Sequence, residues 1–146
     1  MIALVQRVTR AEVRIADTSI AAIGHGVLAL IGVRACDDEH AGTRLAERLL
    51  GYRIFADSGG RMNLSVREVA GSVLVVPQFT LAADTHKGTR PGFSTAAPPE
   101  QARRLFGHFL GYLTTAYAPV SAGVFGADMQ VSLVNDGPVT FWLETP

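Results

Sequence analysis

Cysteine is almost absent from this sequence, and so are the long apolar runs that membrane proteins need. The single cysteine, Cys36, excludes a disulfide within the chain and favours a reducing compartment, so we expect a cytoplasmic protein. No apolar run approaches the roughly 20 residues that span a bilayer. The first residues also lack the basic and apolar segments that are typical of a signal peptide. The sequence therefore predicts no membrane partner.

The chain also lacks an excess of charge of either sign. Its 13 basic and 13 acidic side chains give a formal net charge of zero at pH 7. Proteins that grip long stretches of nucleic acid need many Lys or Arg contacts to phosphate, so DNA binding is not expected. The basic residues are twelve arginines and one lysine, and none lies beyond Arg104. Any nucleic-acid ligand would therefore be held at a small site, by residues from the first two-thirds of the chain.

Signatures of common catalytic and metal sites are missing as well. The sequence has no Gly-x-Ser-x-Gly nucleophile motif, no phosphate-binding glycine-rich loop, and no His-Glu-x-x-His pair. Its four histidines are scattered, whereas zinc generally requires three or four closely arranged ligands. We therefore expect neither a bound metal nor a cofactor.

The sequence does contain enough apolar residues, 48% of 146, to build one domain with a real core over residues 1–146. Helical spacing predicts one helix that is capped by Asp37 or Asp38 and ends near Gly51, and a second that begins at Pro98. Strands are predicted over residues 2–8, 12–15, 19–23, 27–33, 71–76, 120–125, 128–134 and 139–143. Because hairpins join several of these strands, we predict an α/β fold, a strand-rich single domain with a mixed sheet and about two main helices.

A short motif near the C-terminus, Asn135–Thr140 (NDGPVT), lies between two apolar runs. Asp-Gly between strand-like segments predicts a tight hairpin, because glycine tolerates positive φ without steric cost. The following residue, Pro138, fixes φ and removes a backbone N–H group. A rigid turn without a bulky side chain exposes backbone carbonyls, which suits the recognition of a small group by its shape. An ordinary tight turn is the alternative interpretation.

A second motif, Pro77–Leu81 (PQFTL), closes an apolar strand. In an extended chain Gln78 and Thr80 project to one face, and we expect Phe79 and Leu81 to enter the core. A threonine hydroxyl is a poor nucleophile without an adjacent base, and the sequence offers no base nearby. Thr80 therefore either hydrogen-bonds a substrate or a water molecule, or is bonded to backbone at the strand end.

Between this motif and the second helix, residues 82–97 form a long irregular loop rich in Thr, Gly, Pro and charge. Loops of this length are uncommon unless they are functional or disordered. Lys87 and Arg90 are candidate phosphate contacts, and Phe93 is a candidate surface for base stacking. A solvated flexible loop is the competing interpretation.

The two motifs, together with the opening residues Met1–Val8 (MIALVQRV), resemble the D-aminoacyl-tRNA deacylase family over the whole length of the chain. The resemblance implies a barrel-like sheet and a homodimer that hydrolyses the ester linking a D-amino acid to tRNA. It implies that the Gly137–Pro138 pair is cis, enters the active site of the other subunit, and rejects L-amino acids by exclusion. Glycine has no side chain to exclude, so glycyl-tRNA mischarged on tRNA(Ala) should also be accepted.

The resemblance also assigns roles to individual residues. Gln78 and Thr80 are the expected catalytic-pocket residues, with catalysis leaning on main-chain groups and the 2′-hydroxyl of the terminal adenosine. The expected substrate-binding residues are Phe79, Gly137, Pro138, Arg7 and Met129, and the expected tRNA-binding residues are Arg90, Phe93 and Lys87.

One position departs from the family pattern, because Pro77 stands where a serine is usual. A related branch with a trans Gly-Pro pair, which acts on L-alanyl-tRNA mistakes, tends to carry proline there. An L-specific misacyl-tRNA editor is therefore one alternative function. A non-catalytic module that binds the tRNA 3′ end is another, since no catalytic triad is present. A structural homodimer whose C-terminal hairpin only makes an interface is a third.

Overall fold

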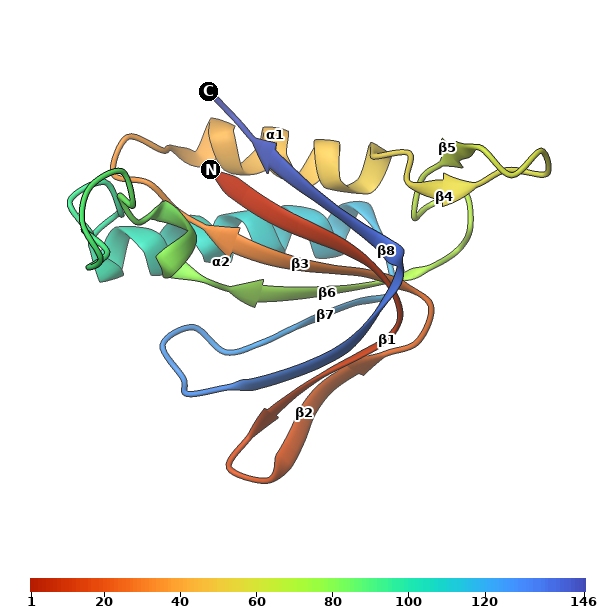
Figure 1. Ribbon diagram of the computed structural model, residues 1–146, viewed down its shortest axis with the longest axis horizontal. Helices are drawn as coiled ribbons and strands as arrows, with labels where there is room; N and C mark the ends of the chain where they lie inside the picture. The colour runs from red at the N-terminus through yellow and green to blue at the C-terminus, as the bar shows by residue number, and fades with distance from the viewer.

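The structure, a computed structural model, describes residues 1–146 and contains two α-helices, one short 3₁₀ helix and eight strands (Figure 1). In chain order the elements are β1 (Ile2–Ile15), β2 (Thr18–Ile23), β3 (Gly26–Gly32), α1 (Glu39–Gly51), β4 (Phe55–Ala56), β5 (Met62–Leu64), β6 (Ser72–Pro77), η1 (Phe79–Ala82), α2 (Pro99–Ala116), β7 (Val120–Ala122) and β8 (Gln130–Glu144).

The main sheet is mixed, as predicted, and it is organised around the long strand β1. β1 pairs antiparallel with β3 along its first half, with β2 along its second half, and with β8 along almost its whole length. β3 pairs with β6 and β6 with β7, both in parallel. The sheet curls until β2 lies against β6 and β7, so it is nearly closed and barrel-like (Figure 1).

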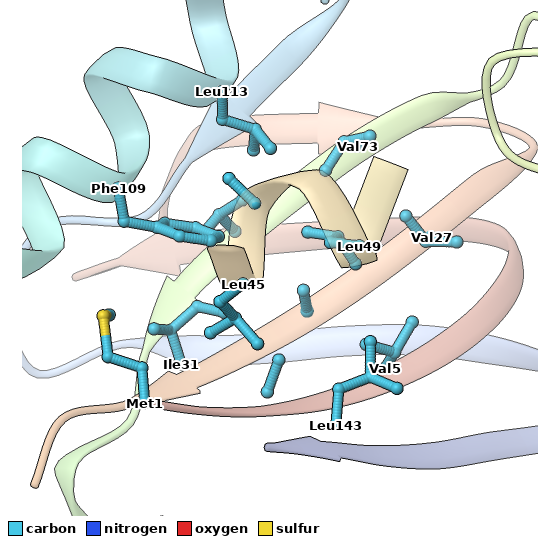
Figure 2. Packing of buried hydrophobic residues seen from close by; sticks show 14 of the residues in the cluster. Met1, Val5, Val27, Ile31, Leu45, Leu49, Val73, Phe109, Leu113 and Leu143 are labelled. Atoms are coloured by element: carbon cyan, nitrogen blue, oxygen red, sulfur yellow. The ribbon is translucent and has the colours of Figure 1, made fainter. Parts of the chain in front are cut away.

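The larger part of the core lies between the two helices and one face of this sheet. Leu45 and Leu49 of α1 and Phe109 and Leu113 of α2 point toward β3 and β6, and all four are fully buried (Figure 2). The apolar stripe predicted for the second helix is therefore confirmed. Complete burial of such side chains contributes about 1.5–3 kcal/mol each. A smaller cluster fills the opposite, inner face of the curled sheet: Val8, Ala11, Val13, Leu28, Leu74 and Val76.

The two neighbouring acids before α1 have different roles. Asp38 is the N-cap, because its carboxylate accepts a hydrogen bond from the backbone N–H of Ala41 at 2.8 Å. Asp37 is buried instead and forms an ion pair with the α-ammonium group of Met1, at 2.6 Å. The same ammonium donates to the hydroxyl of buried Thr145 at 2.7 Å. These contacts join the two ends of the chain to the loop between β3 and α1.

The predicted C-terminal hairpin is wrong. Residues 130–144 form one strand, and both of its halves pair with β1 rather than with each other. Thr140 lies opposite Gln6 and Asn135 lies opposite Val8, so residues 136–139 bulge outward opposite the single residue Arg7. A turn signal depends only on neighbouring residues. It therefore cannot show that β1 runs beside both halves of the segment and pairs with each of them.

Candidate active site

Gln78 and Thr80 lie where β6 ends and the chain turns into η1. The backbone N–H of Gln78 still donates to the carbonyl of Ile31 on β3, at 2.7 Å. Its side-chain amide donates to the Thr80 hydroxyl at 2.5 Å, so the two side chains meet. The close approach of η1 to β3 requires a glycine on β3, because a Cβ at Gly32 would lie 2.9 Å from Cβ of Leu81.

The expectation that Phe79 faces the core is wrong. The Phe79 side chain is 57% exposed, and Leu81 is half-buried against β3. The physical reason is that residues 79–82 leave the extended conformation for a 3₁₀ helix with three residues per turn, which ends the alternation of faces. Phe79 packs instead on Phe93, with the ring centroids 5.2 Å apart, and Phe93 is itself 44% exposed.

A pocket of about 470 Å³ opens between the end of β6, the start of α2 and the loop from β7 to β8. In Figure 1 these segments meet at one end of the sheet, where η1 and the loop that follows it also lie. The pocket brings together three residues that the sequence singled out, Gln78, Phe79 and Met129. Thr80 does not line it but reaches it through Gln78. The other lining residues are Val76, Pro77, Ala97, Pro99, Ala102, Phe125, Gly126, Ala127, Asp128 and Val131.

Two of these lining residues gave no functional signal in the sequence. Ala102 belongs to the apolar stripe of α2, and the stripe is fully accounted for by packing on the sheet. Phe125 falls in a predicted strand, but β7 ends at Ala122 and leaves Phe125 in the loop that walls the pocket. Gly123 lets the backbone of this loop lie close to Met129, since a Cβ there would lie 2.8 Å from the Met129 sulfur.

The long loop after η1 contains one pair of backbone hydrogen bonds of the kind that joins antiparallel strands. Asp84 and Gly92 exchange two backbone hydrogen bonds, of 2.8 and 2.9 Å, and close a small hairpin-like excursion. Lys87 and Arg90 lie on this excursion, and both are exposed and free of ion pairs. Their charges are therefore available to solvent or to a ligand near the Phe79–Phe93 pair.

Arg7 joins the bulge in β8 to the segment before β4. Its guanidinium donates to the backbone carbonyl of Ile54 at 2.7 Å and to that of Asp136 at 3.2 Å, and Nε lies 3.4 Å from the Asp136 carboxylate. Gly137 has a φ of +130°, which suits glycine, and its peptide bond to Pro138 is cis. Both residues at the tip of the bulge are exposed.

The bulge does not lie near the pocket of its own chain. Arg7 is level with Val27 on β3, which is level with Val73 on β6. Gln78 is five residues further along the chain, just past the end of β6, or about 16 Å at the usual rise per strand residue. The structure thus separates Gly137 and Pro138 from Gln78, Phe79 and Met129.

The pocket contains little acid–base chemistry. Asp128 is its single carboxylate, and no group of three or more His, Cys, Asp or Glu side chains is arranged to hold a metal. The groups whose pKa values are shifted lie elsewhere, as with Tyr117, whose pKa is raised by burial. This pocket suits a reaction that depends on positioning more than on proton transfer.

Neither α-helix is long and apolar enough to cross a membrane.

Comparisons with known proteins show which family the chain resembles. The family described as D-Tyr-tRNA(Tyr) deacylase matches residues 4–144. The chain is 58% identical to the D-aminoacyl-tRNA deacylase of Cronobacter sakazakii, over 99% of each chain. It is 57% identical to that of Thioalkalivibrio sulfidiphilus, over 100% of this chain and 98% of the other.

Two solved structures share the fold. One, named c-Myc DNA Unwinding Element Binding Protein, superposes with a TM-score of 0.96 at 41% identity, covering 100% of this chain and 99% of the other. Another, described as a probable eukaryotic D-amino acid tRNA deacylase, has a TM-score of 0.84 and covers 99% of this chain and 98% of its own. Because it is only 18% identical, it supports the fold and nothing more specific. The chain therefore belongs to the D-Tyr-tRNA(Tyr) deacylase family and is a hydrolase that cleaves the ester bond of D-aminoacyl-tRNA.

Proposed function

We propose that this deacylase works as a homodimer in which each pocket is completed by Gly137 and Pro138 of the second subunit. The observation that supports this most strongly is the separation of about 16 Å, along the strand direction, between the bulge and Gln78 of the same chain. Because Gly137 and Pro138 are exposed at the tip of the bulge, a second copy can reach them. One chain supplies the pocket and its partner supplies the backbone wall.

In this arrangement chirality is selected by exclusion. The aminoacylated 3′ end of the tRNA enters the pocket, where Gln78, Phe79 and Met129 contact it. An L side chain on the substrate's α-carbon would collide with the backbone of the Gly137–Pro138 pair, while a D side chain points away from it. Glycine has no side chain to reject, so glycyl-tRNA mischarged on tRNA(Ala) is a second substrate.

Ester cleavage itself needs positioning and charge stabilisation more than an activated nucleophile. The Thr80 hydroxyl accepts a hydrogen bond from Gln78, and a threonine hydroxyl without an adjacent base is a poor nucleophile. Thr80 and Gln78 therefore orient the ester or the attacking water. Backbone N–H groups and the 2′-hydroxyl of the terminal adenosine stabilise the developing oxyanion.

Recognition of the tRNA is confined to its single-stranded end. Lys87 and Arg90 contact phosphates, and Phe93, already paired with Phe79, offers an aromatic face to a base. A chain with zero net charge has few such contacts to offer, which is consistent with a small footprint. The reaction takes place in the cytoplasm and needs no cofactor. It serves translation by removing amino acids that have been wrongly attached to tRNA.

The first experiment measures release of labelled amino acid from D-Tyr-tRNA, L-Tyr-tRNA and Gly-tRNA(Ala), with a chelator present. We expect release from the D-tyrosyl and glycyl substrates and none from L-Tyr-tRNA. Release from L-Tyr-tRNA at a similar rate would refute selection by exclusion and would favour the L-specific editor.

The second experiment tests the shared site by mixing two inactive variants, Gln78→Ala and Gly137→Ala. After the subunits exchange, half of the dimers are mixed, and each mixed dimer contains one intact site. Activity should therefore recover to about one quarter of the wild-type value. If each chain used its own Gly137, the mixture would stay inactive, and that result would overturn the proposal.

A further inference from the structure

Arg103 is fixed against the wall of the pocket. It follows Ala102, which lines the pocket, on the first turns of α2. Its guanidinium carbon lies 4.8 Å from the ring centroid of Phe125, another lining residue. A Cβ at Gly126 would lie 3.5 Å from Nη2 of Arg103, so the guanidinium also covers the adjoining backbone. Cation–π attraction thus holds this charge beside two residues that line the pocket.

The charge of Arg103 is not neutralised within the chain. No carboxylate lies within 4.0 Å of it, and its N–H groups donate no hydrogen bond. Asp128, the one acid lining the pocket, does not pair with it. The neighbouring Arg104, equally cationic, is paired with Glu39 at 2.5 Å. Of these two adjacent arginines, only Arg103 is available to an anion from outside.

A guanidinium held over an aromatic ring is well placed to bind phosphate. Phe125 contacts the planar group from one side and leaves its N–H groups free, in a fork that matches two phosphate oxygens. Because Phe125 restrains the side chain, less conformational freedom is lost when a ligand binds. Arg103 is exposed, as Lys87 and Arg90 are, but its guanidinium is restrained by Phe125 and therefore offers a positioned charge.

We propose that Arg103 binds a backbone phosphate of the tRNA 3′ end, just outside the pocket that receives the terminal aminoacylated nucleotide. The inference rests on the proposed function of that pocket. It assigns Arg103 to substrate binding and not to the chemical step, since Arg103 does not line the pocket. Each phosphate contact to a single strand adds about 0.7 to the slope of log affinity against log salt concentration.

The test compares Arg103→Gln with the matched control Arg104→Gln on two substrates. D-Tyr-tRNA contains the phosphate, and 3′-O-D-tyrosyl-adenosine lacks it. Arg103→Gln should raise KM for D-Tyr-tRNA about tenfold at unchanged kcat and reduce the salt slope by about 0.7. Cleavage of the small substrate should not change. Arg104→Gln should match the wild-type protein on both, and Arg103→Lys should show an intermediate KM because it keeps the charge and loses the fork.

An equal loss on both substrates would overturn the proposal, because it would mean that Arg103 only supports Phe125 in the pocket wall. Unchanged KM and salt slope for D-Tyr-tRNA would overturn it as well. A fluorescence titration with uncharged tRNA gives an independent readout, in which Arg103→Gln should weaken binding about tenfold. If the wild-type protein cleaved neither substrate, the proposed function would fail, and the titration would still decide the role of Arg103.

Discussion

Removal of the Asp37 carboxylate should destabilise this fold far more than removal of its neighbour, Asp38. Asp37 is almost fully buried, and its two oxygens accept from the Met1 ammonium and from the backbone N–H of Arg34, each at 2.6 Å. Asp37→Ala leaves a buried ammonium without its counter-charge. Such losses cost about 3–5 kcal/mol, because the remaining charge stays desolvated.

Asp38→Ala is the matched control, since it removes a carboxylate from the adjacent residue. Asp38 makes one capping hydrogen bond to Ala41, and loss of an N-cap costs about 0.5–2 kcal/mol. For a chain of this size each kcal/mol lowers Tm by about 2–4 °C. We therefore expect a fall of roughly 6–20 °C for Asp37→Ala and only about 1–8 °C for Asp38→Ala.

Urea unfolding followed by circular dichroism, at one fixed protein concentration, measures both free energies and the m-values. Equal losses for the two variants would refute this reasoning. A loss for Asp37→Ala of less than about 1 kcal/mol would refute it too, since the amine would then have lost its proton or found water or another partner.

Three further predictions concern the bulge, the pocket and pH. Gly137 has a positive φ, and a Cβ on it would lie 3.1 Å from the Val139 backbone nitrogen, so Gly137→Ala should reduce cleavage of D-Tyr-tRNA to background. Gly107→Ala, where a Cβ meets nothing, should leave the rate unchanged. Thr80→Ala should keep measurable activity in single-turnover assays, and complete loss with the fold intact would indicate catalysis by the hydroxyl. Burial lowers the pKa of the Met1 ammonium below 8.0, so the unfolded chain binds more protons there. The free energy of unfolding should thus rise with pH up to about 8, and a urea series in which it falls over that range would contradict this.

Local patterns in the sequence determined most of the secondary structure and the family. Apolar spacing predicted α2 with its buried face, and alternation and apolar runs predicted β3 and β6 within a residue or two. These signals succeed because burial of one face repeats at the period of the element itself. The motifs around Gln78 and Gly137 indicated the deacylase family by residue identity, and the comparisons confirmed it.

Only the tertiary structure decided which segments meet. β8 is one strand with a bulge, and not a hairpin, because β1 offers hydrogen-bond partners along its whole length. Asp37 pairs with the α-ammonium group of Met1, and Phe125 lines the pocket together with Ala102. In both cases the residues that meet are far apart in the sequence. Such contacts leave no periodic trace in the sequence, since they depend on where separate elements come to lie. The placement of Arg103 on Phe125, and the distance from Gly137 to the pocket of its own chain, follow from the same three-dimensional arrangement.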